Sequence, residues 1–174
     1  EVQTGFFRTG SAFAWQGYGV RPDIMTLAKG MANGLPIGAV VALENIADAF
    51  RPGDHGSTFG GGPVVCAAAL ATIDALESGD LGRNAIEVGG YLRDGLSAIA
   101  DTTGEIVDVR GRGLMTGITL AHPDAARIAG SLLDDGIVVL SAGDSMLRFL
   151  PPLVCNRAEV DTLLEVLSAA LGRT

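Results

Sequence analysis

Short apolar runs alternate with longer helical stretches through the second half of the chain, and this alternation constrains the fold more than any other feature. It predicts helices over 81–100, 123–135 and 157–171, and strands over 106–110, 114–120, 137–140 and 146–150. Helices that alternate with short strands are typical of a compact α/β unit. Ser78-Gly79-Asp80 interrupts the helical pattern, so we predict an α/β chain with domains 1–79 and 80–174.

The first half has a looser pattern, built around two short apolar runs. Residues 24–28 and 37–43 are apolar and short, which predicts two buried strands of a covered sheet. We also expect a strand end over 1–5, an irregular loop with one helical turn over 6–18, and helices over 44–50 and 64–77. Several alanines in the last of these helices allow close packing within the protein or between subunits.

Composition excludes several classes of partner. The formal net charge is −8 with both signs scattered, which argues against nucleic acid. No apolar run reaches 18 residues and no basic leader precedes an apolar segment, so we expect neither a membrane span nor a signal peptide. Cys66 and Cys155 lack the spacing of a metal site or a disulfide framework, which suggests a reducing, cytoplasmic compartment. With 48% hydrophobic residues, we expect a subunit interface to cover apolar surface.

Lys29 is the only lysine in the chain, and the other strongly basic side chains are arginines. An ammonium can lose its proton when desolvated and attack a carbonyl carbon, which a guanidinium cannot do, so Lys29 is the candidate nucleophile. It follows an apolar run and precedes Gly30 and Gly34, which suit a sharp turn. The alternative is that an arginine-rich genome left one lysine by chance on a surface loop, and composition alone favours that alternative.

Two further features could bind anions. The Gly-rich loop over 55–63 carries the hydroxyls of Ser57 and Thr58 and leads into a helix, the combination that binds a phosphate group, although a flexible connector would look the same. His55 has no companion at ligand spacing, so we interpret it as a loop or interface residue. Arg148 lies mid-strand, where a buried cation needs either a structural carboxylate or a substrate carboxylate.

Several motifs follow one another in order across essentially the whole chain. They are Glu1-Val2-Gln3-Thr4-Gly5, Arg8-Thr9-Gly10, Pro22-Asp23-Ile24, Thr26-Leu27-Ala28-Lys29-Gly30, Leu35-Pro36-Ile37-Gly38-Ala39, His55-Gly56-Ser57-Thr58-Phe59-Gly60-Gly61, Arg110-Gly111-Arg112-Gly113-Leu114 and Leu147-Arg148-Phe149-Leu150-Pro151-Pro152-Leu153. Their order and spacing resemble those of the class III pyridoxal-phosphate aminotransferases. Within this class the chain resembles the acetylornithine aminotransferases and their succinyl-amino-acid relatives.

The resemblance implies a role for each matching residue. Lys29 matches the lysine that holds pyridoxal 5′-phosphate as a Schiff base and then moves a proton between substrate and cofactor. Val2 matches the residue packed on the pyridine ring, and Gln3 the residue near the ring hydroxyl. The pair Ser57 and Thr58 matches the phosphate-binding pair, which in this family reaches into the neighbouring subunit's site, so the resemblance implies a homodimer with shared active sites. Arg148 matches the arginine that grips a substrate carboxylate, and no metal site is implied.

The chain also departs from the family pattern. The family's aspartate on the pyridine nitrogen falls one position before Glu1, whose own side chain we expect to point to the other face of the strand. Gly62 stands where an asparagine is usual. The resemblance therefore implies a C-terminal portion of a fold type I transferase, consisting of the second half of the large domain and a small α/β C-terminal domain.

The expected parent reaction moves an amino group from N-acetylornithine, or a similar ω-amino acid, to 2-oxoglutarate. The isolated chain is expected to be inactive. The alternatives are an ornithine or 4-aminobutyrate aminotransferase, a pyridoxal-phosphate-dependent aminomutase, and a non-catalytic half-protein that pairs with a partner chain.

Overall fold

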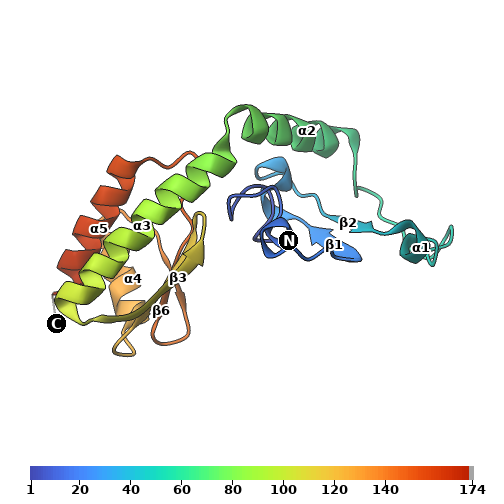
Figure 1. The fold of residues 1–174 in the computed structure, drawn as a ribbon. Coiled ribbons are helices and arrows are strands. Elements are labelled where there is room, and N and C mark those ends of the chain that lie inside the picture. Colours follow the sequence, from blue (N-terminus) through green and yellow to red (C-terminus); the bar gives the residue numbers. More distant parts are fainter. Residues whose placement is uncertain (173–174) are drawn as a thin grey trace. The chain divides into compact units, whose positions relative to one another are not determined.

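The computed structural model describes residues 1–172 and divides the chain into two compact units, Glu1–Gly82 and Arg83–Thr174 (Figure 1). The domain assignment made from the sequence stays a prediction, and its residues 173–174 lie outside the described part of the chain. Within that part, no helix combines the length and the apolar character needed to cross a membrane.

The first unit contains a small sheet and one long helix. Its elements are η1 (Ala14–Tyr18), β1 (Ile24–Leu27), η2 (Lys29–Ala32), β2 (Ala39–Ala42), α1 (Glu44–Ala47) and α2 (Pro63–Ser78). The strands β1 and β2 pair antiparallel, from Ile24 opposite Ala42 to Leu27 opposite Ala39. Helix α2 begins with Pro63 at its first turn, where the missing N–H costs no hydrogen bond.

The expectation of a covered sheet is wrong for this unit. Both strands form within the predicted apolar runs, but four of their eight side chains are exposed and only Leu27 is buried. On β2, Val40 is 65% exposed and its neighbour Val41 is 49% exposed. Successive side chains of a strand point to opposite faces, so neither face is fully covered. The two apolar runs therefore form an apolar surface that no element of this unit covers.

The second unit is a four-stranded antiparallel sheet with helices packed on one face. Its elements are α3 (Leu81–Thr103), β3 (Ile106–Arg112), β4 (Met115–Leu120), α4 (Ala125–Asp134), β5 (Leu140–Ala142), β6 (Met146–Phe149) and α5 (Arg157–Leu171). The strand order is β3-β4-β6-β5. One hydrophobic core joins the helices to the sheet, and its members include Leu92 and Leu96 of α3, Ile118 of β4, Ile128 of α4, Leu147 of β6 and Leu167 of α5. Residues of β4 alternate between buried and half-buried, so the opposite face of the sheet carries no helix of this core.

Two elements show where sequence patterns succeed and fail in this unit. Helix α5 has the predicted bounds, because Asn156 and Glu159 form a reciprocal capping box in which each side chain accepts the other's backbone N–H. The strand predicted over 137–140 is wrong, because β5 covers Leu140–Ala142. Ile137 and Val139 rest against the core without joining the sheet, and Val138 between them is 78% exposed.

Candidate active site

Lys29 stands at the sharp junction between β1 and the η2 turn. Leu27 at the end of β1 is buried, Ala28 is fully extended with φ of −167°, and Lys29 then adopts a left-handed conformation with φ of 48°. A side chain with a Cβ rarely takes this conformation, and such strain is concentrated at functional sites. The Lys29 side chain is exposed, and its amine has no hydrogen bond or ion pair among residues 1–172. The amine is therefore free to react with a carbonyl.

Helix α2 supports the turn that carries Lys29. Ala32 at the end of η2 is almost fully buried, and α2 packs against this turn with Ala69 buried on its surface. Small side chains allow such a close approach. Hydrogen bonds from Met31 N to Ala28 O and from Asn33 N to Gly30 O close the turn. The backbone around Lys29 is thus fixed both by the packing of α2 and by the hydrogen bonds of the turn.

The Gly-rich loop before α2 displays hydroxyl groups and free amide groups together. Ser57 Oγ accepts a hydrogen bond from Gly60 N at 2.9 Å, and any Cβ on Gly60 would meet this Oγ at 2.7 Å. The Thr58 hydroxyl is exposed and has no partner within the described residues. The chain then enters α2 at Pro63, and the first amide groups of this helix lack intrahelical partners. This set of donors suits an anion such as a phosphate group.

The N-terminal segment is held by the carboxylate of Glu1. The strand end expected over 1–5 is wrong, because residues 2–9 form consecutive turns. Glu1 accepts hydrogen bonds from the Thr4 hydroxyl and from the backbone N–H groups of Ala14 and Trp15. Partial burial raises the pKa of the Glu1 carboxyl, but these donors lower that pKa by more, so it lies below its usual value. Val2 and Gln3, which follow, both project to the exposed surface.

Arg148 belongs to the second unit and lies on the helix-free face of its sheet. Its neighbours Leu147 and Phe149 are buried in the core, so Arg148 points to the opposite face. The expectation of a buried cation is wrong, because Arg148 is half-buried. Its guanidinium has no hydrogen bond or ion pair in the described part of the chain. A carboxylate ligand would satisfy it.

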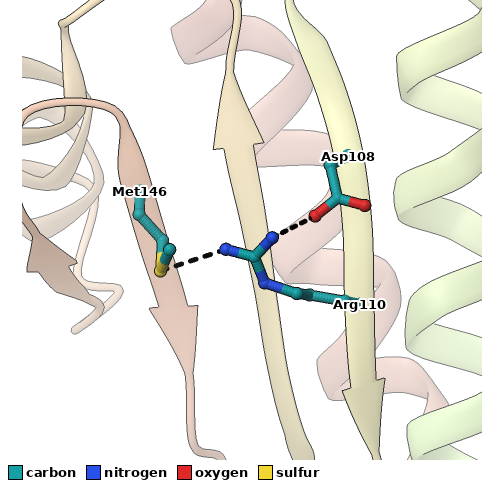
Figure 2. Close-up of polar contacts among 3 residues, drawn as sticks. All are labelled: Asp108, Arg110 and Met146. Carbon is teal, nitrogen blue, oxygen red and sulfur yellow. Dashed lines mark hydrogen bonds and ion pairs between the residues drawn. The ribbon is translucent and has the colours of Figure 1, made fainter.

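Two features of the second unit were not predicted from the sequence. The strand predicted over 106–110 includes Arg110 but gives it no role, whereas its side chain lies on the sheet between Asp108 and Met146 (Figure 2). The second feature is an apolar cavity of about 540 Å³ between α5, the segment before β5 and the residues that follow β6. Cys155 lines this cavity, and burial raises the pKa of its thiol, assisted by the negative charge of Glu159. No predicted site residue lines the cavity.

A comparison with known protein families shows the family to which this chain belongs. The family model described as aminotransferase class-III matches residues 1–171. The chain belongs to the class-III aminotransferase family. This family implies dependence on pyridoxal phosphate, and the residues of this chain fit that cofactor. Lys29 offers a free amine for its aldehyde, and the loop with Ser57 and Thr58 offers donors for its phosphate.

Individual proteins are similar to this aminotransferase chain over nearly its whole length. An acetylornithine aminotransferase from Gloeobacter violaceus is 45% identical over 174 residues, which cover 99% of this chain and 43% of that protein. The crystal structure of acetylornithine aminotransferase from Elizabethkingia anophelis matches all of this chain and 45% of its own, with a TM-score of 0.93 and 34% identity. An Arthrobacter phospholyase in complex with phosphoethanolamine matches all of this chain and 44% of its own, with a TM-score of 0.93 and 36% identity. This aminotransferase chain therefore spans less than half the length of these relatives.

Proposed function

We propose that this chain is the C-terminal portion of an enzyme that moves an amino group from N-acetylornithine, or a similar ω-amino acid, to 2-oxoglutarate. The observation that carries the proposal is the 45% identity over 99% of the chain to an acetylornithine aminotransferase. The free amine of Lys29 at a strained turn supports it, because amino transfer requires a nucleophilic amine at the cofactor.

Each predicted residue has a task in this proposal. Pyridoxal phosphate, when bound, supplies the electron sink that the amino-acid side chains lack. Lys29 Nζ would hold the cofactor through a Schiff base and, once released, would move a proton at the substrate carbon that bears the amino group. Val2 would pack on the cofactor ring, and Gln3 would lie near the ring hydroxyl. Arg148 would bind a substrate carboxylate through paired N–H groups.

We propose in addition that the parent enzyme is a homodimer in which Ser57 and Thr58 bind the phosphate at the neighbouring subunit's site. The loop that carries them is exposed, and Phe59 beside them is 89% exposed. Such an aromatic side chain would be covered in an interface. In this proposal the isolated 174-residue chain is inactive, because it spans 43% of the length of its acetylornithine aminotransferase relative.

The first test asks whether Lys29 captures the cofactor. The purified chain is incubated with pyridoxal phosphate, reduced with borohydride and digested, and the modified peptides are mapped by mass spectrometry. Because Lys29 carries the only side-chain amine in the chain, the folded chain should be labelled there well above an unfolded control. A Ser57→Ala/Thr58→Ala variant should lose this excess. Equal labelling of folded and unfolded chains would mean that this chain alone builds no cofactor site.

The second test addresses the reaction itself. The longer polypeptide that contains this chain should form glutamate from 2-oxoglutarate and N-acetylornithine, and Lys29→Arg should abolish this reaction while keeping the charge. The phospholyase similarity makes elimination the informative alternative. Release of ammonia or phosphate from an amino phosphate ester without any keto acid would support a lyase and contradict amino transfer. Conversion of an amino acid without a second keto acid would support an aminomutase.

A further inference from the structure

The helix-free face of the second sheet carries two arginines in one row, separated by a glycine. Gly117 of β4 pairs with Arg110 on β3 and with Arg148 on β6. Residues directly opposite one another on paired strands point to the same face, so both arginines project on the same side as Gly117. Two strand spacings separate their Cα atoms, roughly 10 Å. Two long cationic side chains at this separation can reach one small anion.

The fold itself does not require glycine at position 117. Its φ is not in the left-handed region, and a Cβ added there would meet only Leu147 O, at 3.5 Å, which is an ordinary contact. Glycine inside a strand costs stability and often marks the close approach of a ligand. By comparison, Gly111 has a φ of 152° and a Cβ there would meet Met115 O at 2.3 Å, so glycine at 111 is structural. The open space above Gly117 is therefore available to a ligand.

Arg110 is held beside this space. Its guanidinium forms an ion pair with Asp108 at 2.5 Å and reaches Met146 Sδ at 3.8 Å (Figure 2). Asp108 on β3 and Met146 on β6 both lie opposite Thr119 of β4, so the guanidinium crosses β4 at Thr119, which is on the same face as Gly117 and two residues from it. A guanidinium has five N–H donors, and Arg110 remains 55% exposed, so it keeps donors for another acceptor.

We propose that Arg110 and Gly117 complete the carboxylate subsite of Arg148. One carboxylate of the substrate lies over Gly117 and accepts hydrogen bonds from both arginines, while Asp108 holds Arg110 in place. The anion also relieves the repulsion between the two cations. This inference rests on the proposed function and adds two residues to it, one that binds the carboxylate and one that leaves room for it.

The test measures binding separately from turnover. Glutarate, a dicarboxylate without a reactive carbonyl, is titrated calorimetrically into the cofactor-loaded full-length polypeptide, and KM and kcat for 2-oxoglutarate are measured in parallel. Arg110→Ala should weaken glutarate binding and raise KM by about tenfold, the effect of removing one charge-assisted hydrogen bond. Arg110→Lys should recover part of this loss. Gly117→Val should cause a similar loss by filling the space, and Gly117→Ala a smaller one.

Arg127→Ala is the matched control. Arg127 is also an exposed arginine paired with an aspartate, Asp124, but it lies on α4, away from this face of the sheet. Its removal should leave glutarate binding unchanged. Thermal unfolding of each variant separates lost binding from lost folding, and Arg110→Ala decides the matter if Gly117→Val unfolds. The inference is overturned if Arg110→Ala binds glutarate as well as Arg127→Ala does, or if the unmodified protein binds no glutarate.

These outcomes are distinguishable from failure of the proposed function. If amino transfer is absent but glutarate binding depends on Arg110 and Gly117, the subsite stands and the reaction assignment fails. If amino transfer is present and depends on Lys29 while Arg110→Ala changes neither Kd nor KM, the function stands and the subsite fails.

Discussion

At the scale of single residues, the clearest energetic defect is the hydroxyl of Thr116. This side chain lies on the core face of β4, is almost fully buried, and its Oγ1 has no hydrogen-bond partner among the described residues. Burying an unpaired hydroxyl is unfavourable, so replacing it with a methyl group should help. We expect Thr116→Val to raise the free energy of unfolding by about 1 kcal/mol. Urea denaturation measures this change from the shift in midpoint at constant slope.

Thr119→Val provides the control for that substitution. Thr119 is on the same strand but is half-buried on the helix-free face, so its hydroxyl can reach water. Its replacement should change stability little. A Thr116→Val variant less stable than Thr119→Val would mean that the Thr116 hydroxyl has a partner, such as a bound water, that stabilises the fold.

Lys29 shows which residue-scale features a sequence does not encode. Its being the only lysine makes it a candidate nucleophile from the sequence alone. Its left-handed backbone could not be predicted, because Gly30 beside it is the residue that usually takes such a conformation. Arg110 was predicted within a strand over 106–110, but a single strand does not reveal its neighbours on the sheet. Only the strand register places Arg110 in one row with Arg148.

At the scale of elements, helix α3 contacts the turn between β3 and β4 through a glycine. A Cβ on Gly89 would lie 1.9 Å from Gly113 O, and the guanidinium of Arg93, one turn further along, donates a hydrogen bond to the same oxygen at 2.8 Å. We expect Gly89→Ala to destabilise the protein by about 1–3 kcal/mol, because it forces the helix and the turn apart. Thermal unfolding should show a lower midpoint.

The neighbouring Gly90 is a stringent control, because nothing lies within 4 Å of a Cβ added there. Gly90→Ala should stabilise the protein by up to about 1 kcal/mol through its better helix propensity. The two adjacent substitutions should thus act in opposite directions. Equal effects would show that α3 does not approach the β3–β4 turn as closely as the contact with Gly113 requires.

The elements also show why most of the fold, but not all of it, follows from sequence. Helix α5 was predicted with its bounds because a capping box and a clear period act together. The predicted strand over 137–140 failed because an apolar run reports burial and not hydrogen bonding. Ile137 and Val139 are partly buried against the core, yet pairing with β6 begins only at Leu140. Local pattern cannot distinguish these two situations.

At the scale of the whole molecule, the exposed apolar surface of the first unit predicts self-association. Its exposed large apolar side chains are Val2, Tyr18, Val20, Ile24, Leu35, Val40, Val41, Phe50, Phe59, Val64 and Leu70. Soluble monomers rarely expose contiguous apolar patches of more than a few hundred Å². The sequence indicated that these residues need a cover, but it could not say which chain or segment supplies that cover.

The 174-residue chain should therefore sediment as an oligomer at micromolar concentrations, and Val40→Lys should shift it toward the monomer by placing a charge on β2. Val107→Lys is the matched control, because Val107 is 64% exposed, close to the 65% of Val40, but stands on β3 in the second unit. It should leave association unchanged, since singly exposed apolar side chains are ordinary. A stable monomer for the unmodified chain would contradict the prediction. If both variants weaken self-association equally, the interface is not specific to the sheet formed by β1 and β2. A segment outside this chain would then have to cover Val40 and Val41.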